Sequence, residues 1–401
     1  MQTKQIGTLV ALYIATSAIA FGGFKLAFAN GAVAPAGSAG GGLANLISPS
    51  VPKSSGGVNV DSSLPKTEEC PINGAMFTKP EAEAWAKRRP LAVMIENHMD
   101  ARPQSGLSKA DVIYEAVAEG GITRFMGLFY CAAQAKDTIV APVRSARSYF
   151  IEWASDYNNP LYVHVGGANN FGNDGTDKRV QALEQLTTYG WAQVNDIDGR
   201  GVSYPVFARN YNRVPGKDLA TEHTMESSTS RVWEFAATKR GLTNKDKKGT
   251  DWSTGFVKWT FADDAATSGA SQKISYEFWE GFKQFAVQWD YDSTSNTYLR
   301  TMAGEKHVDL NDGKQLATKN VVILYTKEEG PVDVHKHMWY QTAGSGKAVI
   351  FQNGKRVDAT WSKKDRTSRL TFTDTKGKSV PFVRGQVWIS VLQTNTPVDV
   401  Q

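Results

Sequence analysis

The chain has 401 residues, 41% of them hydrophobic and 21% charged, and its formal net charge at pH 7 is +5. This composition is typical of a globular protein that buries sizeable cores, and the length suggests two domains with accessory segments. The small positive charge is compatible with an anionic ligand or surface. The chain contains no block of Lys and Arg of the kind found in nucleic-acid-binding arms, so we expect no nucleic-acid partner.

The first segment, residues 1–29, has the pattern of a membrane-targeting sequence. Residues 6–24 are apolar apart from Gly, Thr and Ser, with Lys4 before them and Lys25 after them. About nineteen residues are just enough to cross a bilayer as a helix. A retained signal anchor and a signal peptide cleaved after Ala29 both fit, and the length and charged flanks favour the anchor. Both alternatives predict folded domains outside the cytoplasm, and the anchor predicts a single-pass protein of the cell membrane.

Residues 30–66 are rich in Gly, Ala, Ser and Pro, which indicates a flexible linker without a core. Beyond the linker lie the two cysteines of the chain, Cys70 and Cys131. In an oxidising compartment the simplest prediction is one disulfide between them, and the alternative is a pair of buried thiols. A disulfide closing a loop of this length would stabilise the fold by roughly 4 kcal/mol through chain entropy.

Strand and helix patterns alternate through residues 67–241, which predicts an α/β layered domain. The predicted strands are 91–96, 111–119, 122–130 and 161–165, and the predicted helices are 80–85, 145–157, 177–189 and 227–240. A polar connector follows at 242–251. Residues 252–401 are almost all strand-like, with turn pairs such as Asn353-Gly354 between the strands, which predicts an antiparallel β-rich domain. The predicted fold class is therefore α+β.

Polar side chains gather around the first strands, between residues 90 and 147. Charged residues so close to apolar strands are costly to bury unless they are paired, so we expect them to line a shared pocket or edge. One turn carries Arg144, Ser145 and Arg147, and Ser145 is a natural N-cap for the helix that follows. Free N–H groups at a helix start, together with two guanidinium groups, predict a site for an anion.

Acidic residues of the neighbouring strands offer another partner for the two arginines. Structural ion pairs with Glu96, Glu115 or Glu119 are the alternative to an anion site. Glu115 and Glu119 also invite comparison with a glycosidase pair, but four residues along one strand separate their stems by roughly 13 Å. The two carboxyl groups of such enzymes lie about 5–9.5 Å apart. Glu96 and His98 are closer and would suit general acid–base chemistry, whereas a hydrogen-bonded pair at a strand end is the simpler interpretation.

Two further histidine patterns have a simpler structural interpretation. His164 lies in an apolar strand, where a hydrogen-bonded core histidine is the default. Asp333, His335 and His337 would share one face of an extended segment and could meet a metal, but the surrounding sequence indicates an exposed loop. The sequence shows neither a P-loop nor a dinucleotide fingerprint. We therefore predict no metal and no cofactor.

Several longer segments carry a family resemblance. They read MIENHMDARPQSGLSKADVIYEAVAEGGITRFMGLFY, APVRSAR, YVHVGG and EHT in the first half, and WDYD, YLR, KNVVI and RGQVWI in the second. With these segments the chain resembles the YerB-like lipoprotein family, a domain of unknown function. The resemblance implies a membrane-anchored extracytoplasmic protein with an α/β part and a β part, and it implies no activity. Two features depart from the family pattern: no Cys for lipid attachment follows the apolar run, and Thr224 follows His223 where Asn is more frequent.

Two classes of function follow from these observations. The first is a tethered protein that binds an anionic envelope ligand, such as a lipid-linked phosphate, a glycopolymer or a peptide carboxylate. The second is an envelope enzyme, a phosphoryl or glycopolymer transferase or a hydrolase, that uses the same arginines and acids. Because no cofactor motif is present, binding is favoured. The predicted ligand-binding candidates are Glu96, His98, Arg102, Glu119, Arg124, Arg144, Ser145, Arg147, His164 and His223.

Overall fold

The computed structural model describes residues 57, 61, 63–265 and 273–401. The predicted anchor or signal peptide at 1–29 lies outside these residues, as does the predicted linker apart from residues 57, 61 and 63–66. Within the described ranges, no helix has the length and apolar character needed to cross a membrane.

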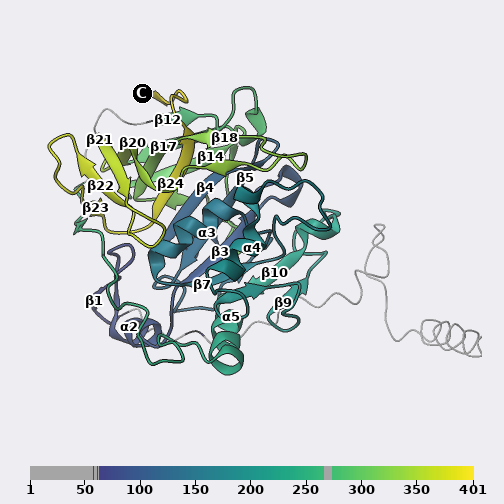
Figure 1. The fold of residues 1–401 in the computed structure, drawn as a ribbon. Helices are drawn as coiled ribbons and strands as arrows, with labels where there is room; N and C mark the ends of the chain where they lie inside the picture. Colours follow the sequence, from purple (N-terminus) through teal and green to yellow (C-terminus); the bar gives the residue numbers. More distant parts are fainter. Residues whose placement is uncertain (1–56, 58–60, 62, 266–272) are drawn as a thin grey trace, which may run out of the picture. The chain divides into compact units, whose positions relative to one another are not determined.

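A ten-stranded mixed sheet forms the centre of the fold (Figure 1). Three of its strands are the apolar runs predicted from the sequence, β3 (Leu91–Glu96), β4 (Val112–Glu119) and β5 (Ile122–Phe129). They are almost wholly buried, which explains why they are continuous apolar runs rather than alternating ones. β5 is antiparallel to both of its neighbours, so β3 and β4 point in the same direction. The other strands are β7 (Leu161–His164), β8 (Asp196–Asp198), β17 (Asn320–Thr326), β20 (Gly344–Gln352), β21 (Lys355–Lys363), β22 (Thr371–Asp374) and β24 (Val387–Gln393).

The same sheet joins strands from the two halves of the chain. β24 pairs in parallel with β4, with Val387 opposite Val112, and it pairs in parallel with β17 on its other side. The strand order is β22-β21-β20-β17-β24-β4-β5-β3-β7-β8. The parallel β17–β24 pair corrects the prediction of a wholly antiparallel second half. Strands outnumber helices among the described residues, and both halves belong to one compact unit.

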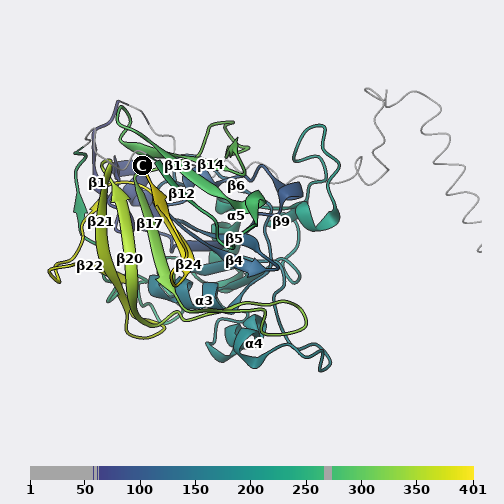
Figure 2. The same cartoon turned by 90° about the horizontal axis from the view of Figure 1, so that it is seen from above.

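A second, antiparallel sheet covers one face of the central sheet, and α3 (Ser148–Ala154) and α4 (Ala182–Thr188) lie on the other (Figure 2). Neighbouring residues of β4 show how strand alternation separates the two layers. Tyr114 stacks on Trp153 of α3, whereas Glu115 pairs with Arg300 of the second sheet. The strands of the second sheet are β12 (Lys273–Tyr276), β13 (Val287–Asp292), β14 (Thr297–Met302), β15 (Glu305–Lys306), β16 (Ala317–Thr318) and β25 (Asp399–Val400).

The helices are short, and the first two show how local sequence and tertiary contacts compete. α2 (Lys79–Trp85) begins where predicted, and Thr78 and Glu81 form a capping box at its start. α3 begins at Ser148 with Arg147 at the N-cap position and without a side-chain cap bond. The prediction of Ser145 as N-cap is therefore wrong, because its segment is extended and hydrogen-bonded between strands.

The later helices are interrupted or extended by other helical turns. The predicted helix at 177–189 is divided into the 3-10 turn η5 (Lys178–Val180) and α4. The predicted helix at 227–240 begins as α5 (Thr229–Phe235) and continues as the π-helical turn η7 (Ala236–Arg240), which ends at Gly241 with a φ of +67°. Small sheets complete the described fold: β1 (Lys66–Glu69) with β2 (Met76–Thr78), β6 (Ile139–Val140) with β10 (Met225–Ser228) and β9 (Phe207–Arg209), β11 (Phe261–Ala262) with β23 (Phe382–Val383), and β18 (Glu328–Glu329) with β19 (Trp339–Tyr340).

A disulfide fixes the start of the fold to the end of β5. Cys70 and Cys131 are bonded, with their Cα atoms 5.9 Å apart, which confirms the predicted bridge. Asp111, just before β4, fastens the same place, since it accepts hydrogen bonds from the N–H groups of Tyr130 and Cys131 at 2.7 and 2.9 Å. Both cysteines and the aspartate are buried.

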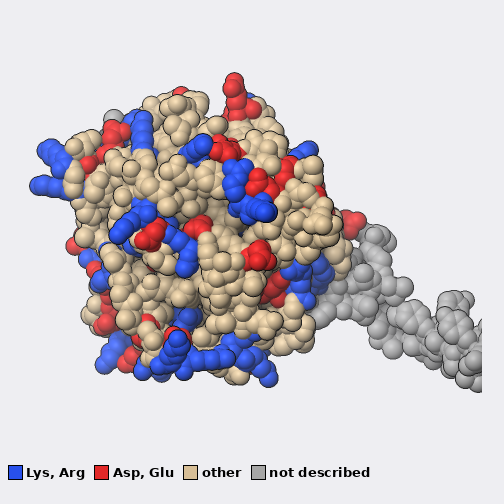
Figure 3. Space-filling model, in the orientation of Figure 1, with Lys and Arg blue, Asp and Glu red and all other residues tan. Residues whose placement is uncertain are grey.

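Basic and acidic side chains are interspersed on the face shown in Figure 3. Arginines elsewhere on the surface lie within ion-pair distance of acids, such as Arg179 with Glu329 at 2.7 Å and Arg384 with Glu69 at 2.6 Å. Each of these exposed pairs contributes little stability, so an unbalanced charge is most informative where side chains are buried.

Candidate functional site

The candidate site lies at the carboxyl ends of the parallel strands β3, β4 and β7. These strands end at Glu96, Glu119 and His164. Arg124, near the start of the antiparallel strand β5, lies opposite Glu96 in the register. The sheet therefore brings to one edge four of the ionisable residues that the sequence singled out.

A segment from the loop before α3 enters between β3 and β7 beyond their last paired residues. The Arg144 N–H donates to the Met94 carbonyl at 2.9 Å, and the Val165 N–H donates to the Arg144 carbonyl at 3.1 Å. The Arg144 side chain is thereby placed where the two parallel strands separate. Open α/β sheets commonly bind ligands at such a separation, at the carboxyl ends of the strands.

Two arginines share one carboxylate at this edge. Arg124 Nη2 donates to Glu119 Oε1 at 2.9 Å, and Arg147 donates to both oxygens of Glu119 at 3.0 and 2.7 Å. Arg124 and Arg147 are buried, and the Nε of Arg124 has no hydrogen-bond partner among the described residues. Burial raises the pKa of Glu119, but the two guanidinium groups lower it more, so that its pKa lies well below its ordinary value. For Arg147 the structure thus shows the ion-pair alternative, and Arg144 is also paired, with Glu96 at 3.1 Å.

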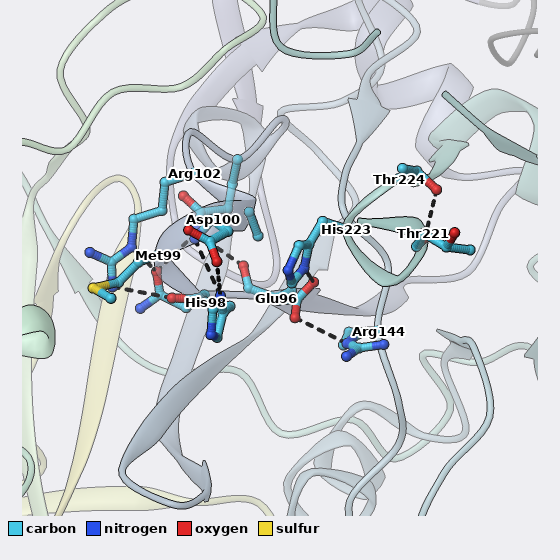
Figure 4. A network of polar contacts seen from close by, with 12 residues as sticks. Glu96, His98, Met99, Asp100, Arg102, Arg144, Thr221, His223 and Thr224 are labelled. Carbon is cyan, nitrogen blue, oxygen red and sulfur yellow. Dashed lines mark hydrogen bonds and ion pairs between the residues drawn. The ribbon is translucent and has the colours of Figure 1, made fainter. Parts of the chain in front are cut away.

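Glu96 contacts an arginine with one oxygen and a histidine with the other (Figure 4). Its Oε1 accepts from Arg144 Nε at 3.1 Å, and its Oε2 lies 2.9 Å from His223 Nδ1. Glu96 and His223 are buried, whereas 31% of the Arg144 side chain is exposed. In a neutral His223 ring, the Nδ1 proton faces Glu96 and the lone pair of Nε2 is left without a hydrogen bond among the described residues. This is the orientation of a general base or of a metal ligand.

His98 lies beside His223, on the turn that follows β3. The centroids of the two rings are 5.1 Å apart and their planes differ by 14°. His98 caps the 3-10 turn η2 (Met99–Ala101), because its Nδ1 accepts from the Asp100 N–H at 3.3 Å. The Asp100 carboxylate lies 3.5 Å from the same nitrogen, and the side chains of His98 and Asp100 are 33% and 70% exposed. Figure 4 shows this pair on the side of Glu96 away from Arg144.

A buried arginine that the sequence did not single out ties the two histidine-bearing turns together. Arg213 Nε donates to the His223 carbonyl at 2.7 Å, Nη1 donates to the Pro103 carbonyl at 2.8 Å, and Nη2 donates to the Ala101 carbonyl. Burial lowers the pKa of Arg213 to about 10. Nothing local in the sequence indicates this role, since all three partners are backbone carbonyls.

Arg102 and Ser145 do not join the residues around Glu96 through their side chains. Arg102 Nη2 donates to the carbonyls of Asn97 and Gln284 at 3.1 and 2.9 Å, and its guanidinium lies over the Phe285 ring at 5.0 Å. Ser145 contributes its carbonyl, which accepts from Arg124 Nη1 at 3.2 Å. The two residues therefore support the backbone of the site.

His164 is a fully buried histidine with a partner on each ring nitrogen. Its Nε2 lies 2.6 Å from Asp196 Oδ1, and its Nδ1 lies 2.7 Å from the Gly166 carbonyl. Both partners are acceptors, so the protonated ring, with an N–H on each nitrogen, fits both contacts. Burial lowers the pKa of His164, but Asp196 raises it more, and the net result is a raised pKa. This environment is that of a hydrogen-bonded core residue.

The two remaining acidic residues of interest, Glu115 and Asp333, have their hydrogen-bond and ion-pair partners within the fold. Glu115 is paired with Arg300 at 2.8 Å, both without exposed surface, so it takes no part in the edge site. The Asp333 carboxylate accepts from the His335 and His337 N–H groups at 3.1 and 3.2 Å and lies 2.8 Å from His337 Nδ1. The latter segment is a loop, as the sequence indicated.

Comparison with known proteins places this arrangement in a family. Residues 77–241 match the family described as "Protein of unknown function (DUF3048) N-terminal domain", and residues 275–389 match the C-terminal domain of the same description. The chain belongs to this family.

A relative in Bacillus subtilis strain 168, named "Putative lipoprotein YerB", is 28% identical over 306 residues, which are 76% of this chain and 82% of the relative. The crystal structure of the YerB protein from Bacillus subtilis has a TM-score of 0.62 at 25% identity, over 81% of this chain and 97% of that one. The resemblance inferred from the sequence segments is thereby confirmed, and it extends to the fold. Neither description names an activity for the family.

Proposed function

We propose that this protein is tethered at the cell membrane, outside the cytoplasm, and binds an anionic ligand of the cell envelope at the sheet edge around Glu96 and Glu119. The observation that carries the binding proposal is the balance of charge at this edge. Counted over the ion pairs alone, three guanidinium groups share two carboxylates, which leaves one positive charge in surplus among them; the groups are those of Arg124, Arg144 and Arg147 against Glu96 and Glu119. A surplus charge in a mostly buried cluster favours an anionic partner.

Arg144 is the residue best placed to contact that ligand. Of the three nitrogens of the Arg144 side chain, only Nε donates a hydrogen bond to a described residue, so the two Nη groups are available to a ligand. Its side chain is also far more exposed than those of Arg124 and Arg147. A planar guanidinium with two free donor groups matches a phosphate or a carboxylate, through charge-assisted hydrogen bonds. A lipid-linked phosphate, a phosphate-bearing glycopolymer and a peptide carboxylate share this chemistry.

The tether rests on two observations that are independent of the site. Residues 6–24 are apolar and long enough for an anchor, and a Gly- and Ser-rich linker follows them. The relative from Bacillus subtilis carries the name "Putative lipoprotein YerB", and lipoproteins are a membrane-attached class of protein. A linker of about 37 residues has a typical reach of roughly 30–35 Å, which would hold the folded part close to the membrane surface.

Thermal unfolding of the chelator-treated full chain tests the anion site. We compare inorganic phosphate and an N-acetyl amino acid with chloride at equal ionic strength. A ligand present at 100 times its dissociation constant stabilises the folded state by about 2.7 kcal/mol. Arg144→Lys keeps the charge but loses the planar fork, so the stabilisation should largely disappear while the melt in chloride is unchanged.

The matched control is Arg356→Lys, which alters an exposed arginine paired with Asp358. This variant should respond to the anions as the parent does. A parent that is indifferent to both anions, or an Arg144→Lys variant that responds like the parent, would contradict the proposal. A response to phosphate alone would select a phosphate-bearing ligand over a peptide carboxylate.

An envelope enzyme is the second candidate, and the Glu96–His223 pair favours it. The carboxylate orients the ring, so that His223 Nε2 could accept a proton from a nucleophile that attacks the bound ligand. Turnover of a glycerol-phosphate polymer by the full chain tests this candidate. His223→Gln should abolish the turnover, and His335→Gln, in the exposed loop, should leave it unchanged. Binding of phosphate without turnover would leave the first candidate alone.

A further inference from the structure

We propose that His98, Asp100 and His223 form a binding site for a divalent transition metal of the Zn²⁺ class. One ligand atom from each of the three residues lies within 4.8 Å of the other two. Two imidazoles and a carboxylate are ligands that Zn²⁺ accepts, and three protein ligands leave a further position open, as in catalytic zinc sites. The inference does not rest on the proposed anion site, because its three ligands are not among the residues proposed to bind the anion, although Glu96 contacts both His223 and Arg144.

The contact between His223 and Glu96 supplies the support that a metal-binding histidine needs. Metal-ligating histidines usually donate their other ring N–H to a carboxylate or a carbonyl, which fixes the tautomer and the ring orientation. His223 Nδ1 lies 2.9 Å from Glu96 Oε2, so the free Nε2 is the ligand atom. Glu96 is in turn held by Arg144 at 3.1 Å, and both Glu96 and His223 are buried.

Two basic side chains, those of Arg213 and Lys217, hold the backbone of the ligand-bearing turns through hydrogen bonds to carbonyl groups. Arg213 connects the carbonyl of His223 to those of Ala101 and Pro103, on the far side of the His98 turn. Lys217 Nζ donates to the Arg102 carbonyl at 3.1 Å, so the same turn is held a second time. A site whose ligand-bearing segments are positioned by such supporting contacts requires little rearrangement on binding.

The ligand atoms of His98, Asp100 and His223 lie somewhat further apart than in a zinc site, so the side chains of His98 and Asp100 would have to move a short way toward His223. Zinc–ligand bonds of about 2.0–2.1 Å place tetrahedral ligand atoms about 3.3 Å apart. His223 is fixed, but the His98 and Asp100 side chains are 33% and 70% exposed and can turn toward it. Asp100, beside His98, and Glu222, which interacts electrostatically with both histidines, also bring negative charge to the site, which offsets the charge of a divalent ion.

Titration of the metal-free full chain with Co²⁺ alone tests the proposal, because Co²⁺ that is bound by nitrogen and oxygen ligands has a visible absorption spectrum. We expect one Co²⁺ per chain and its displacement by Zn²⁺. Glu96→Gln, which removes the orienting carboxylate charge, should weaken binding roughly 10–100-fold. His98→Ala and Asp100→Asn should weaken it at least as much, with thermal melts close to that of the parent, since the His98 side chain is partly exposed and the Asp100 side chain is largely exposed.

His335→Ala is the control, because His335 is another exposed histidine near a carboxylate, with its Nε2 3.3 Å from Asp174. It should bind Co²⁺ as the parent does. A parent without a Co²⁺ spectrum, or His98→Ala and Asp100→Asn variants that bind like the parent, would overturn the proposal. So would a loss of binding in His335→Ala, which would place the ion in the exposed loop. No phosphate is present in this titration, so its failure is distinguishable from failure of the anion site.

Discussion

The buried pair of Glu115 and Arg300 gives a quantitative test of how the two halves of the chain are joined. Their side chains have no exposed surface, and Arg300 Nη2 donates to Glu115 Oε2 at 2.8 Å. The guanidinium lies over the Trp388 ring at 4.3 Å, and the Trp388 Nε1–H donates to the same carboxylate at 3.2 Å. Arg300→Met retains much of the volume but leaves Glu115 buried without its counter-charge. Breaking a buried pair from one side costs about 3–5 kcal/mol, a large part of the roughly 5–15 kcal/mol that stabilises a typical domain.

Urea unfolding followed by tryptophan fluorescence measures this loss in Arg300→Met and in the double variant Glu115→Leu with Arg300→Met. The double variant should recover part of the stability, because it removes the unpaired charge of Glu115, whereas the Trp388 N–H loses its acceptor. As a control, Arg356→Met breaks a pair whose side chains are 42% and 53% exposed, and it should cost about 0–1 kcal/mol. An Arg300→Met loss no larger than that of the control, or a double variant as unstable as Arg300→Met, would refute the reasoning.

Three further predictions concern His164, the disulfide and Arg213. The pKa of His164 is raised in the fold, so the stability that its protonated ring contributes is complete below about pH 6.5 and is lost as the pH rises through the folded pKa. Urea unfolding at increasing pH should show this loss of stability in the parent. A His164→Gln variant with the same pH dependence would count against the prediction. Labelling of the denatured, unreduced protein should find no free thiol at Cys70 or Cys131, and Cys131→Ser should cost about 4 kcal/mol in urea unfolding; two labelled cysteines would contradict the bond. Arg213→Met should increase amide hydrogen exchange in the turns at 98–103 and 221–223, because it removes three hydrogen bonds to their carbonyls; unchanged exchange there would show that the turns are held by other contacts.

Local sequence patterns were sufficient for most of the strands. The apolar runs of the first half became β3, β4 and β5, and the Asn353-Gly354 pair forms the turn between β20 and β21 with φ values of +55° and +70°. The pairing of β24 with β4 was not predictable in this way, because Val387 and Val112 are far apart in the sequence. Which sheet edge a distant strand covers depends on the edges that earlier strands leave free, and no short pattern encodes that choice.

The start of α3 shows a local signal overridden by tertiary structure. A serine followed by helical spacing favours an N-cap at Ser145. In the fold, the neighbouring Arg144 has its N–H and carbonyl bonded to Met94 and Val165, which keeps this segment extended and delays the helix to Ser148. The two backbone hydrogen bonds to adjoining strands replace the one that a serine cap would have made. The same insertion gives Arg144 its position at the sheet edge.

Glu96 shows why the sequence could assemble the candidates without assigning their contacts. Spacing suggested that Glu96 and His98 form a pair, but the carboxylate of Glu96 contacts Arg144 and His223 instead. One buried carboxylate therefore joins the arginine of the proposed anion site to the histidine of the proposed metal site. A change at Glu96 should affect both sites, whereas Arg144→Lys acts on the anion side and His98→Ala on the metal side. Only substitutions on opposite sides of Glu96 can therefore show whether the two sites operate separately or as one.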